Sequence, residues 1–329
     1  MDKKIAIVGG SGFLGSSLVR KLNKTKEKFV VFDKVPSDET DSFIEIDVED
    51  PYSLYQLKDC NIIINLAAVH RDDIKPISKY DDVNVQGAIN ICKAASNYGI
   101  NKIIFTSSVA IYGFAPKNTG EDGEPNYFND YGRTKFLAEQ VYKEWQSQNS
   151  DKRSLTIIRP TVIFGEGNRG NVYNLLKSIN SGRFFMIGNG KNIKSIAYVE
   201  NVSSCLMFFF DAKPGIHIYN YIDKPDISMN KLISTVRNIL FKKNNVGLRL
   251  PVFLGLIIGK AADVVAFLLK INLPVSSIRV KKFLATTQFN SSIYNTNFKP
   301  DYSLQDGLEK TIKYEFIENN AHKKTFDTE

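Results

Sequence analysis

The chain alternates short apolar runs with segments of helical periodicity. Runs rich in β-branched residues occupy 4–9, 28–33, 61–68, 102–108 and 154–165. Continuous apolar runs such as NIIINLAA are typical of strands buried on both faces of a sheet. Between two of them, segment 83–99 has helical spacing and ends on Gly99, a helix stop signal. The alternation predicts an α/β fold with a doubly wound parallel sheet and right-handed crossovers.

A glycine motif follows the first apolar run. The stretch VGGSGFLG places Gly9, Gly12 and Gly15 where a helix is expected to begin. Glycine allows the tight turn and lets backbone N–H groups approach a pyrophosphate, which then faces the positive end of the helix dipole. The second run ends on Asp33, whose carboxylate can accept both ribose hydroxyls of an adenosine and repels a 2′-phosphate. The pattern favours NAD, although Lys34, which follows directly, leaves NADP open.

Two further segments fit a dinucleotide site. Asp47, in FIEIDVED, ends the next strand-like run and can accept a hydrogen bond from an adenine amino group, or it is a plain turn aspartate. NLAA (65–68) carries small residues where the fourth strand ends. A cofactor can lie against the backbone there, and ordinary close packing is the alternative.

Composition narrows the class of protein. The chain has 329 residues and a formal net charge of +8, but its lysines and arginines are scattered, which argues against nucleic-acid binding. The three cysteines are far apart and only three histidines are present, so neither a disulfide framework nor a metal site is expected. The N-terminus lacks the pattern of a secretory signal peptide, and we expect a cytoplasmic protein.

The stretch YGRTK places Tyr131 four residues before Lys135 on an amphipathic helix. This spacing brings both side chains to one helix face. A phenol has an ordinary pKa of about 10, too high for a base at neutral pH, and a nearby ammonium group lowers it. The pair alone does not separate a catalytic tyrosine from a structural one.

The order of these segments carries a family resemblance. GGSGFLG, Asp33, NLAA, TSSVAIYG (106–113), YGRTK and RPTVIFGEG (159–167) occur at familiar separations. The chain resembles the extended short-chain dehydrogenase/reductase family, the NAD-dependent epimerase/dehydratase group, over about residues 3–315. In particular it is similar to UDP-galactose 4-epimerase-like enzymes. On the stretch 273–292 it is similar to UDP-N-acetylquinovosamine dehydrogenase-like 4-ketoreductases of surface-polysaccharide pathways.

The resemblance implies a Rossmann-type fold with a smaller C-terminal substrate lobe, and a catalytic set of Ser108, Tyr131 and Lys135. Tyr131 would take the proton from a sugar hydroxyl at C4 while the carbon passes hydride to the nicotinamide ring. Ser108 would hold the reacting oxygen, and Lys135 would also bind the nicotinamide ribose. An epimerase returns the hydride to the other face of the 4-keto sugar, whereas a reductase or dehydrogenase releases the product.

The resemblance also implies two sets of binding residues, and no metal. The cofactor set comprises Gly9, Gly12, Phe13, Leu14, Gly15, Asp33, Lys34, Asp47, Val48, Leu66, Ala67, Ala68, Tyr131, Lys135 and Pro160. The UDP-sugar substrate set comprises Ser108, Tyr131, Asn171, Val172, Lys194 and Arg279.

Some positions depart from the family pattern. Lys194 stands where the family has a diphosphate-binding arginine, and Arg279 can supply the missing guanidinium. Arg159 and Arg169 are further phosphate donors, although Arg159 lies in a strand and can be structural instead. Val162 occupies a position where sugar epimerases often have asparagine.

We expect two domains. Residues 1–166 would form the NAD-binding domain, to which 195–212 returns, and 167–329 would form mainly the substrate lobe. The family commonly dimerises through the helix of YxxxK and the helix of 83–99, which predicts a homodimer. The apolar run 252–273 contains Lys260, Asp263 and Lys270, so we expect burial in the small lobe, with peripheral membrane contact as the alternative.

The leading hypothesis is an NAD-dependent 4-ketoreductase or dehydrogenase of a UDP-N-acetylhexosamine, because of the stretch 273–292. A UDP-sugar 4-epimerase is the alternative. Two further hypotheses are a 3β-hydroxysteroid-dehydrogenase-like enzyme and a non-catalytic NAD-sensing module. The intact set of Ser108, Tyr131 and Lys135 argues against the last.

Overall fold

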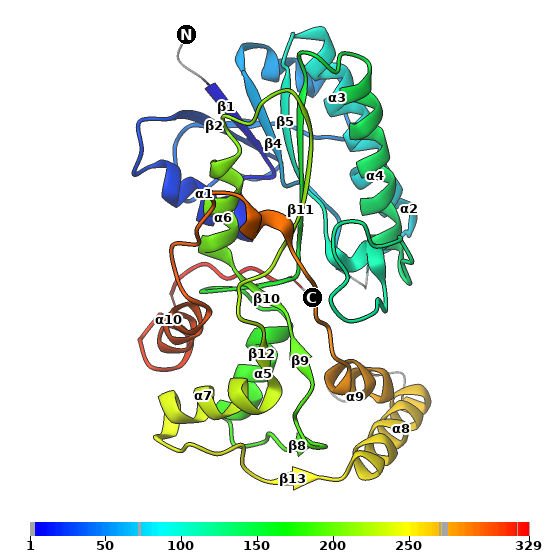
Figure 1. The fold of residues 1–329 in the computed structure, drawn as a ribbon, viewed down its shortest axis with the longest axis vertical. Coiled ribbons are helices and arrows are strands. Elements are labelled where there is room, and N and C mark those ends of the chain that lie inside the picture. The colour runs from blue at the N-terminus through cyan, green and yellow to red at the C-terminus, as the bar shows by residue number, and fades with distance from the viewer. Residues whose placement is uncertain (1–3, 72–73, 270, 272–275, 321, 329) are drawn as a thin grey trace.

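A seven-stranded parallel sheet forms the centre of the molecule (Figure 1). The computed structural model describes residues 4–71, 74–269, 271, 276–320 and 322–328. The strand order is β11-β6-β5-β4-β1-β2-β3, and every pairing is parallel. The strands are β1 (Lys4–Val8), β2 (Lys28–Asp33), β3 (Phe43–Glu45), β4 (Ile62–Asn65), β5 (Lys102–Thr106), β6 (Ser154–Pro160) and β11 (Gly215–Tyr221). This order is that of a doubly wound dinucleotide-binding sheet, and it confirms the predicted fold class.

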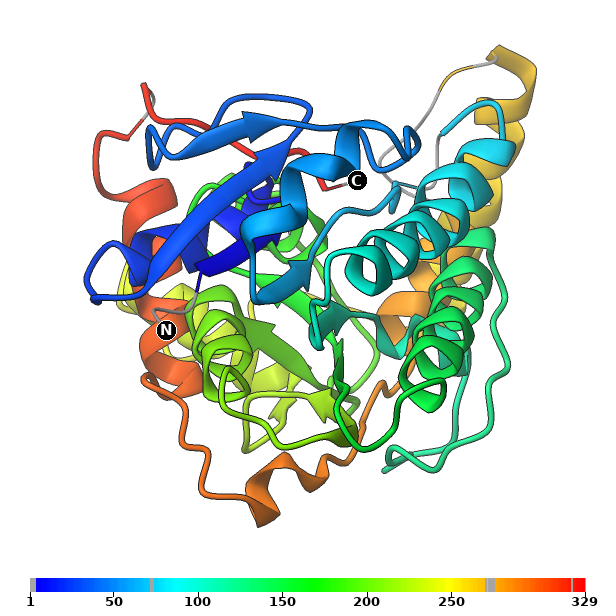
Figure 2. The same ribbon diagram turned by 90° about the horizontal axis from the view of Figure 1, so that it is seen from above.

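Helices cover both faces of the sheet because the side chains of each strand alternate between two apolar cores (Figures 1 and 2). In β1, Ile5 and Ile7 join one core, while Ala6 and Val8 join the other. The first core contains α1 (Phe13–Leu22) and α6 (Val199–Phe208), and the second contains α3 (Gly87–Asn97) and α4 (Asp130–Ser147). In α4, Ala138 and Tyr142 of the FLAEQVY stripe pack on the sheet; the homodimer stays a prediction.

The helix expected at 83–99 begins earlier than its apolar spacing indicates. It starts as α2 (Ser78–Tyr80), passes through a π-helical turn, η2 (Asp81–Gln86), and continues as α3. The turn contains Asn84, a buried polar residue whose amide binds the backbone of Val69 through Val69 N–H at 2.8 Å and Val69 C=O at 2.9 Å. The π-helical turn thus provides the Asn84 side chain, which holds the loop after β4 in place by hydrogen bonds to Val69.

The chain crosses between the two lobes several times. After β6 come β7 (Val162–Phe164), α5 (Asn171–Asn180), β8 (Met186–Ile187), β9 (Ile193–Lys194) and β10 (Ile196–Tyr198). β10 pairs with β7, α6 then packs on α1, and β11 pairs with β6. The main sheet therefore includes β11, which follows the segment 195–212. We had expected only that segment to return to the NAD-binding domain.

The second lobe holds the remaining elements. They are β12 (Ile227–Ser228), α7 (Met229–Phe241), β13 (Arg249–Leu250), α8 (Val252–Leu269) and α9 (Ser277–Leu284); η4 (Ser292–Asn295) and α10 (Leu304–Phe316) follow. α8 does not lie in the core of this lobe, because the residues it buries are Gly255 and Gly259. The expectation that the apolar run 252–273 is buried is therefore wrong for the described part of the run. Its apolar composition reflects an outward-facing surface.

A buried ion pair joins α4 to the sheet. Arg159 of β6 donates two hydrogen bonds to the Glu139 carboxylate, at 2.8 and 2.7 Å, and both residues are almost fully buried. The same guanidinium donates to the Tyr112 hydroxyl at 2.5 Å, and Tyr112 donates to Asn220 of β11 at 2.9 Å. Arg159 is thus structural, which settles the choice left open by the sequence.

Replacing Arg159 by methionine leaves Glu139 buried without its partner. We expect Arg159→Met to lower the free energy of unfolding by about 3–5 kcal/mol in urea denaturation. Lys313→Met is the matched control, because it breaks an exposed pair with Glu309 and should cost less than about 1 kcal/mol. Equal losses for the two variants would contradict the structural role of Arg159.

Candidate active site

The glycine turn after β1 lies against the loop after β4. Gly9 has a φ of +77°, and a Cβ built there would come within 2.4 Å of the Ala67 nitrogen. A Cβ on Gly15 would come within 2.4 Å of the Gly10 oxygen. The residues Leu66, Ala67 and Ala68 are half-buried beside this turn. The two backbone segments therefore form one surface at the carboxyl edge of the sheet, where doubly wound folds bind their ligands.

The N-terminus of α1 is suited to an anion. Gly12 is its N-cap, no side chain of the described residues caps it, and its first turn contains no acidic residue. Phe13 and Leu14 are buried in the core, and the backbone N–H groups of the first turn point toward the N-terminal end of the helix, as in every α-helix. Unsatisfied N–H groups and the helix dipole attract a phosphate.

The end of β2 is held rigidly and is acidic. The Asp33 carboxylate accepts hydrogen bonds from Ser11 N–H at 2.9 Å and from Lys34 N–H at 2.7 Å. The Lys34 ammonium group lies 2.9 Å from both Asp47 and Glu49. Lys34 is thus neutralised by two carboxylates, which makes this corner unfavourable for a 2′-phosphate. Val48 is buried, and its carbonyl accepts from Asn90 at 2.9 Å.

The start of α4 fixes the position of Tyr131. The Asn129 side chain caps the helix by accepting from Gly132 N–H at 2.9 Å. A Cβ on Gly132 would come within 2.5 Å of the Ala110 oxygen, so α4 can approach η3 (Val109–Tyr112) closely. Asn84 donates to the Thr134 hydroxyl at 2.9 Å, which ties this turn to the loop after β4.

Tyr131 shares a hydrogen bond with Ser108, which follows β5, and Lys135 lies one helical turn after Tyr131 with its side chain over β5. Burial raises the pKa of Tyr131 to about 12, although a hydrogen bond with Ser108 opposes the rise. Burial also lowers the pKa of Lys135 to about 7, against the field of Glu139. The Lys135 ammonium lies over the Phe105 ring, 4.3 Å from its centroid. Without a bound cation, this environment keeps the phenol protonated at neutral pH.

Sequence reasoning missed two residues that position this set. Asn84 holds the loop after β4 against α4, and Glu139 lies one turn after Lys135, where it faces Arg159. A polar residue inside an apolar helical stripe is the signal that could have revealed both. Sequence reasoning also missed the contact of the C-terminal segment with the start of α1, where Phe326 packs on Phe13 with ring centroids 5.7 Å apart.

Apart from Ser108 and Tyr131, the residues expected to bind substrate lie after residue 166, in the segment expected to form mainly the substrate lobe. Asn171 is exposed at the start of α5, whereas the Val172 side chain is buried. Arg169 pairs with Glu315 at 2.8 Å. Lys194 donates to the carbonyls of Lys282 and Ala285, at 2.9 and 2.7 Å, and burial lowers its pKa to about 8. Lys194 therefore fastens the end of α9, and its contact with a diphosphate stays a prediction.

The roles of Arg279 and Pro160 stay predictions. Arg279 is exposed on α9, and Pro160 is buried at the end of β6. In the stretch 273–292, on which the ketoreductase resemblance depends, residues 273–275 lie outside the described residues. The loops after β1, β2 and β4 thus place most of the expected cofactor residues at the carboxyl edge of the sheet. The binding of substrate by Asn171, Lys194 and Arg279 stays a prediction.

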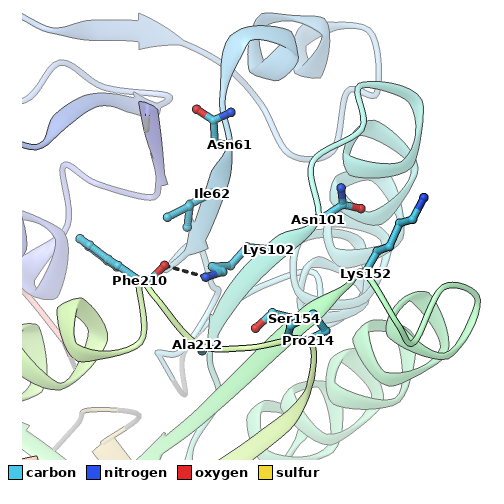
Figure 3. A pocket seen from close by; sticks show the side chains of 9 residues that line it. All are labelled: Asn61, Ile62, Asn101, Lys102, Lys152, Ser154, Phe210, Ala212 and Pro214. Atoms are coloured by element: carbon cyan, nitrogen blue, oxygen red, sulfur yellow. Dashed lines mark hydrogen bonds between the residues drawn. The ribbon is translucent and has the colours of Figure 1, made fainter. Parts of the chain in front are cut away.

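A hollow of about 290 Å³ lies at the opposite, amino-terminal edge of the sheet (Figure 3). It is lined by residues at the starts of β4, β5 and β6, among them Asn61, Lys102 and Ser154. Lys102 donates to the Phe210 carbonyl across it, at 2.6 Å. Doubly wound sheets bind ligands at the other edge, and we assign no chemistry to this hollow.

The fold and the phosphate loop define a Rossmann-type dinucleotide-binding enzyme. Residues 5–221 match the profile of the NAD dependent epimerase/dehydratase family. The chain belongs to this family, which confirms the predicted extended short-chain dehydrogenase/reductase with NAD as its cofactor. The glycine loop, the uncapped start of α1 and the acidic end of β2 fit this cofactor.

One relative is similar over its whole length. It is the N-acetyl-alpha-D-glucosaminyl-diphospho-ditrans,octacis-undecaprenol 4-epimerase of Escherichia coli O157:H7, 43% identical with 100% of both chains covered. Among solved structures, the UDP-N-acetylglucosamine 4-epimerase of Methanobrevibacter ruminantium M1 has a TM-score of 0.74 at 19% identity, covering 95% of this chain and 98% of its own. The UDP-glucuronic acid 4-epimerase of Bacillus cereus with NAD gives 0.70 at 20%, covering 94% and 98%. These structures show the same fold.

The buried lysine makes stability depend on pH. Because the pKa of Lys135 falls from 10.5 unfolded to about 7 folded, the unfolded state binds more protons between these values, and stability rises with pH. In the absence of cofactor, the free energy of unfolding of wild type should rise with pH relative to that of Lys135→Met. The difference should grow by at most about 1.4 kcal/mol per pH unit between pH 7 and 10.5. Urea denaturation from pH 7 upward measures the difference.

Lys93→Met is the matched control, because Lys93 is an exposed lysine on α3. Its stability should follow wild type at every pH. If Lys135→Met also ran parallel to wild type, burial would not control the charge of Lys135.

The acidic corner at β2 should set cofactor preference. In protein stripped of nucleotide, Asp33→Asn should weaken NAD binding about tenfold, because a hydrogen bond to a charged acceptor is lost. The same substitution should weaken NADP binding less, because it also removes the negative charge that repels the 2′-phosphate. Calorimetric titration with both nucleotides measures the ratio, and Asp38→Asn, on the following exposed loop, is the control. An unchanged ratio would remove Asp33 from the adenosine site.

Proposed function

We propose that this protein is an NAD-dependent 4-epimerase of an N-acetylhexosamine joined through a diphosphate to a polyprenol. The observation that carries the proposal is the 43% identity, over the whole of both chains, with the epimerase of N-acetylglucosaminyl-diphospho-undecaprenol. Identity at this level over both lobes includes the segments that select substrate. The coarser activity, NAD-dependent chemistry of the epimerase/dehydratase family, is common to the epimerase and the ketoreductase or dehydrogenase hypotheses.

Three residues of the chain act at the C4 hydroxyl in this proposal. Ser108 holds the hydroxyl oxygen through the same hydroxyl that now binds Tyr131. Tyr131 moves the proton to and from this oxygen, and Lys135 orients the cofactor ribose. When bound, NAD supplies the hydride acceptor and a positive ring that lowers the pKa of Tyr131. Lys135 is buried and Tyr131 is partly buried, which limits the access of water to a 4-keto sugar between the two half-reactions.

The proposal changes the order of the two activities considered from the sequence. The 4-ketoreductase hypothesis depended on stretch 273–292, whose first three residues lie outside the described residues. A full-length relative that is an epimerase favours epimerisation. A UDP-sugar 4-epimerase is the second candidate, favoured by neighbours of the same fold that act on UDP-sugars.

The substrate is tested directly by offering both carriers. Purified enzyme should convert detergent-dispersed N-acetylglucosaminyl-diphospho-polyprenol to its C4 epimer without net NADH, and should convert UDP-N-acetylglucosamine much more slowly. Tyr131→Phe should lower kcat by about 10²–10⁴. Tyr98→Phe, a half-exposed tyrosine at the end of α3, should leave kcat unchanged.

Each other outcome overturns a specific part of the proposal. Steady accumulation of NADH would make the protein a dehydrogenase. Faster conversion of the UDP-sugar would assign a nucleotide carrier. Full activity of Tyr131→Phe would remove the catalytic tyrosine.

A further inference from the structure

Helix α8 presents a broad apolar surface to solvent. Its outward side chains include Phe253, Ile257, Val264, Phe267, Leu268 and Leu269, and Phe267 and Leu268 are 82% and 70% exposed. The inward stripe consists mainly of small residues around Gly255 and Gly259, which allow the helix to lie close to Ile187 and Ser277. Figures 1 and 2 show α8 and α9 at the periphery of the second lobe. An exposed apolar patch of this extent marks an interaction surface.

The surroundings of this surface are strongly basic. Residues 242–282 contain eight lysines and arginines and one acidic residue, Asp263. The Asp263 carboxylate accepts from Ser277 N–H at 3.2 Å, so it holds the start of α9 against α8. An apolar helix flanked by cations is complementary to an anionic bilayer, whose acyl chains take the apolar side chains and whose phosphates attract the cations.

The geometry favours a helix lying in the plane of the bilayer over one that crosses it. By length and composition α8 is a candidate span among the described helices. However, β13 pairs with β8 just before α8, and α9 packs back against α8 just after it. A span would need to return across about 30 Å, whereas the eight residues of α9 extend about 12 Å. Both ends of α8 thus belong to one side.

Helix α9 links α8 to an exposed aromatic pair near Tyr131. Lys282 of α9 lies over the Phe128 ring, 5.5 Å from its centroid, and Phe128 stacks on Phe114 at 4.9 Å. Both rings are half or more exposed, and Phe128 shortly precedes Tyr131. On the other side, the last turn of α9 is fastened to Lys194. The same short helix therefore contacts both α8 and the Phe128 ring, which lies three residues before Tyr131.

We infer that α8 and α9 form a docking face for an anionic bilayer surface, with α8 lying flat at the boundary between headgroups and acyl chains. Docking places the aromatic pair Phe114 and Phe128 at the membrane, so a sugar diphosphate can reach Tyr131 while its polyprenyl chain stays among the lipids. The purpose given to the docking face rests on the proposed function, whereas the binding itself does not.

Co-sedimentation of the full-length protein with vesicles tests the docking face. The protein should bind vesicles of phosphatidylethanolamine and phosphatidylglycerol, bind phosphatidylcholine vesicles less, and lose part of its binding at high salt. The double variant Phe267→Ser, Leu268→Ser should lower the partition coefficient at least about tenfold, because both side chains would leave the lipid. Tyr52→Ser and Ile317→Ser remove exposed apolar side chains elsewhere and should bind like wild type.

Thermal unfolding and light scattering of the same proteins complete the test. Unchanged Tm in the double variant shows that its loss of binding is not unfolding. The inference is overturned if wild type does not bind anionic vesicles, or if the double variant binds as well as wild type. A second copy of the chain would be the occupant of this face if wild type does not bind vesicles and light scattering gives the double variant a lower molar mass than wild type. That result would also overturn the inference.

The substrate assay keeps the two proposals separate. Epimerisation of the detergent-dispersed lipid without vesicle binding would contradict only the inference of a docking face. Vesicle binding without epimerisation would sink only the proposed function.

Discussion

The contact between Arg159 and Glu139 is the constraint on which the candidate active site depends. Glu139 lies one turn after Lys135 on α4, and Arg159 comes from β6. The same guanidinium reaches Tyr112, in the short helix that follows Ser108. One buried cation therefore fixes the distance between the two segments that supply the reacting hydroxyls. Burying such an ion pair costs desolvation free energy. In return, the pair fixes the position of α4 relative to the short helix that follows Ser108.

Burial shifts the two catalytic pKa values in opposite directions and for the same reason. Desolvation disfavours charge, so it raises the pKa of Tyr131 and lowers the pKa of Lys135. The pair is thereby close to neutral until a positive ring enters the site. A bound nicotinamide ring with a positive charge would lower the pKa of Tyr131, and proton movement would then depend on the oxidised cofactor.

The sequence predicted those parts that local patterns encode. The glycine loop, the end of β2 at Asp33 and the parallel sheet follow from spacing within short stretches, and the fold class is confirmed. The partnership of Glu139 with Arg159 could not be predicted, since it joins residues far apart in the chain. The exposure of α8 was predicted wrongly because an apolar helix has the same composition whether it packs in a core or on a lipid surface.

The position of β11 has a consequence for biosynthesis. This strand pairs with β6 along its full length, yet more than fifty residues separate the two strands in the chain. While the ribosome is still making the intervening segments, β6 remains an open edge with unpaired backbone groups, a template for association between nascent chains. A piece of the chain that ends between β6 and β11 would leave that edge without its neighbouring strand.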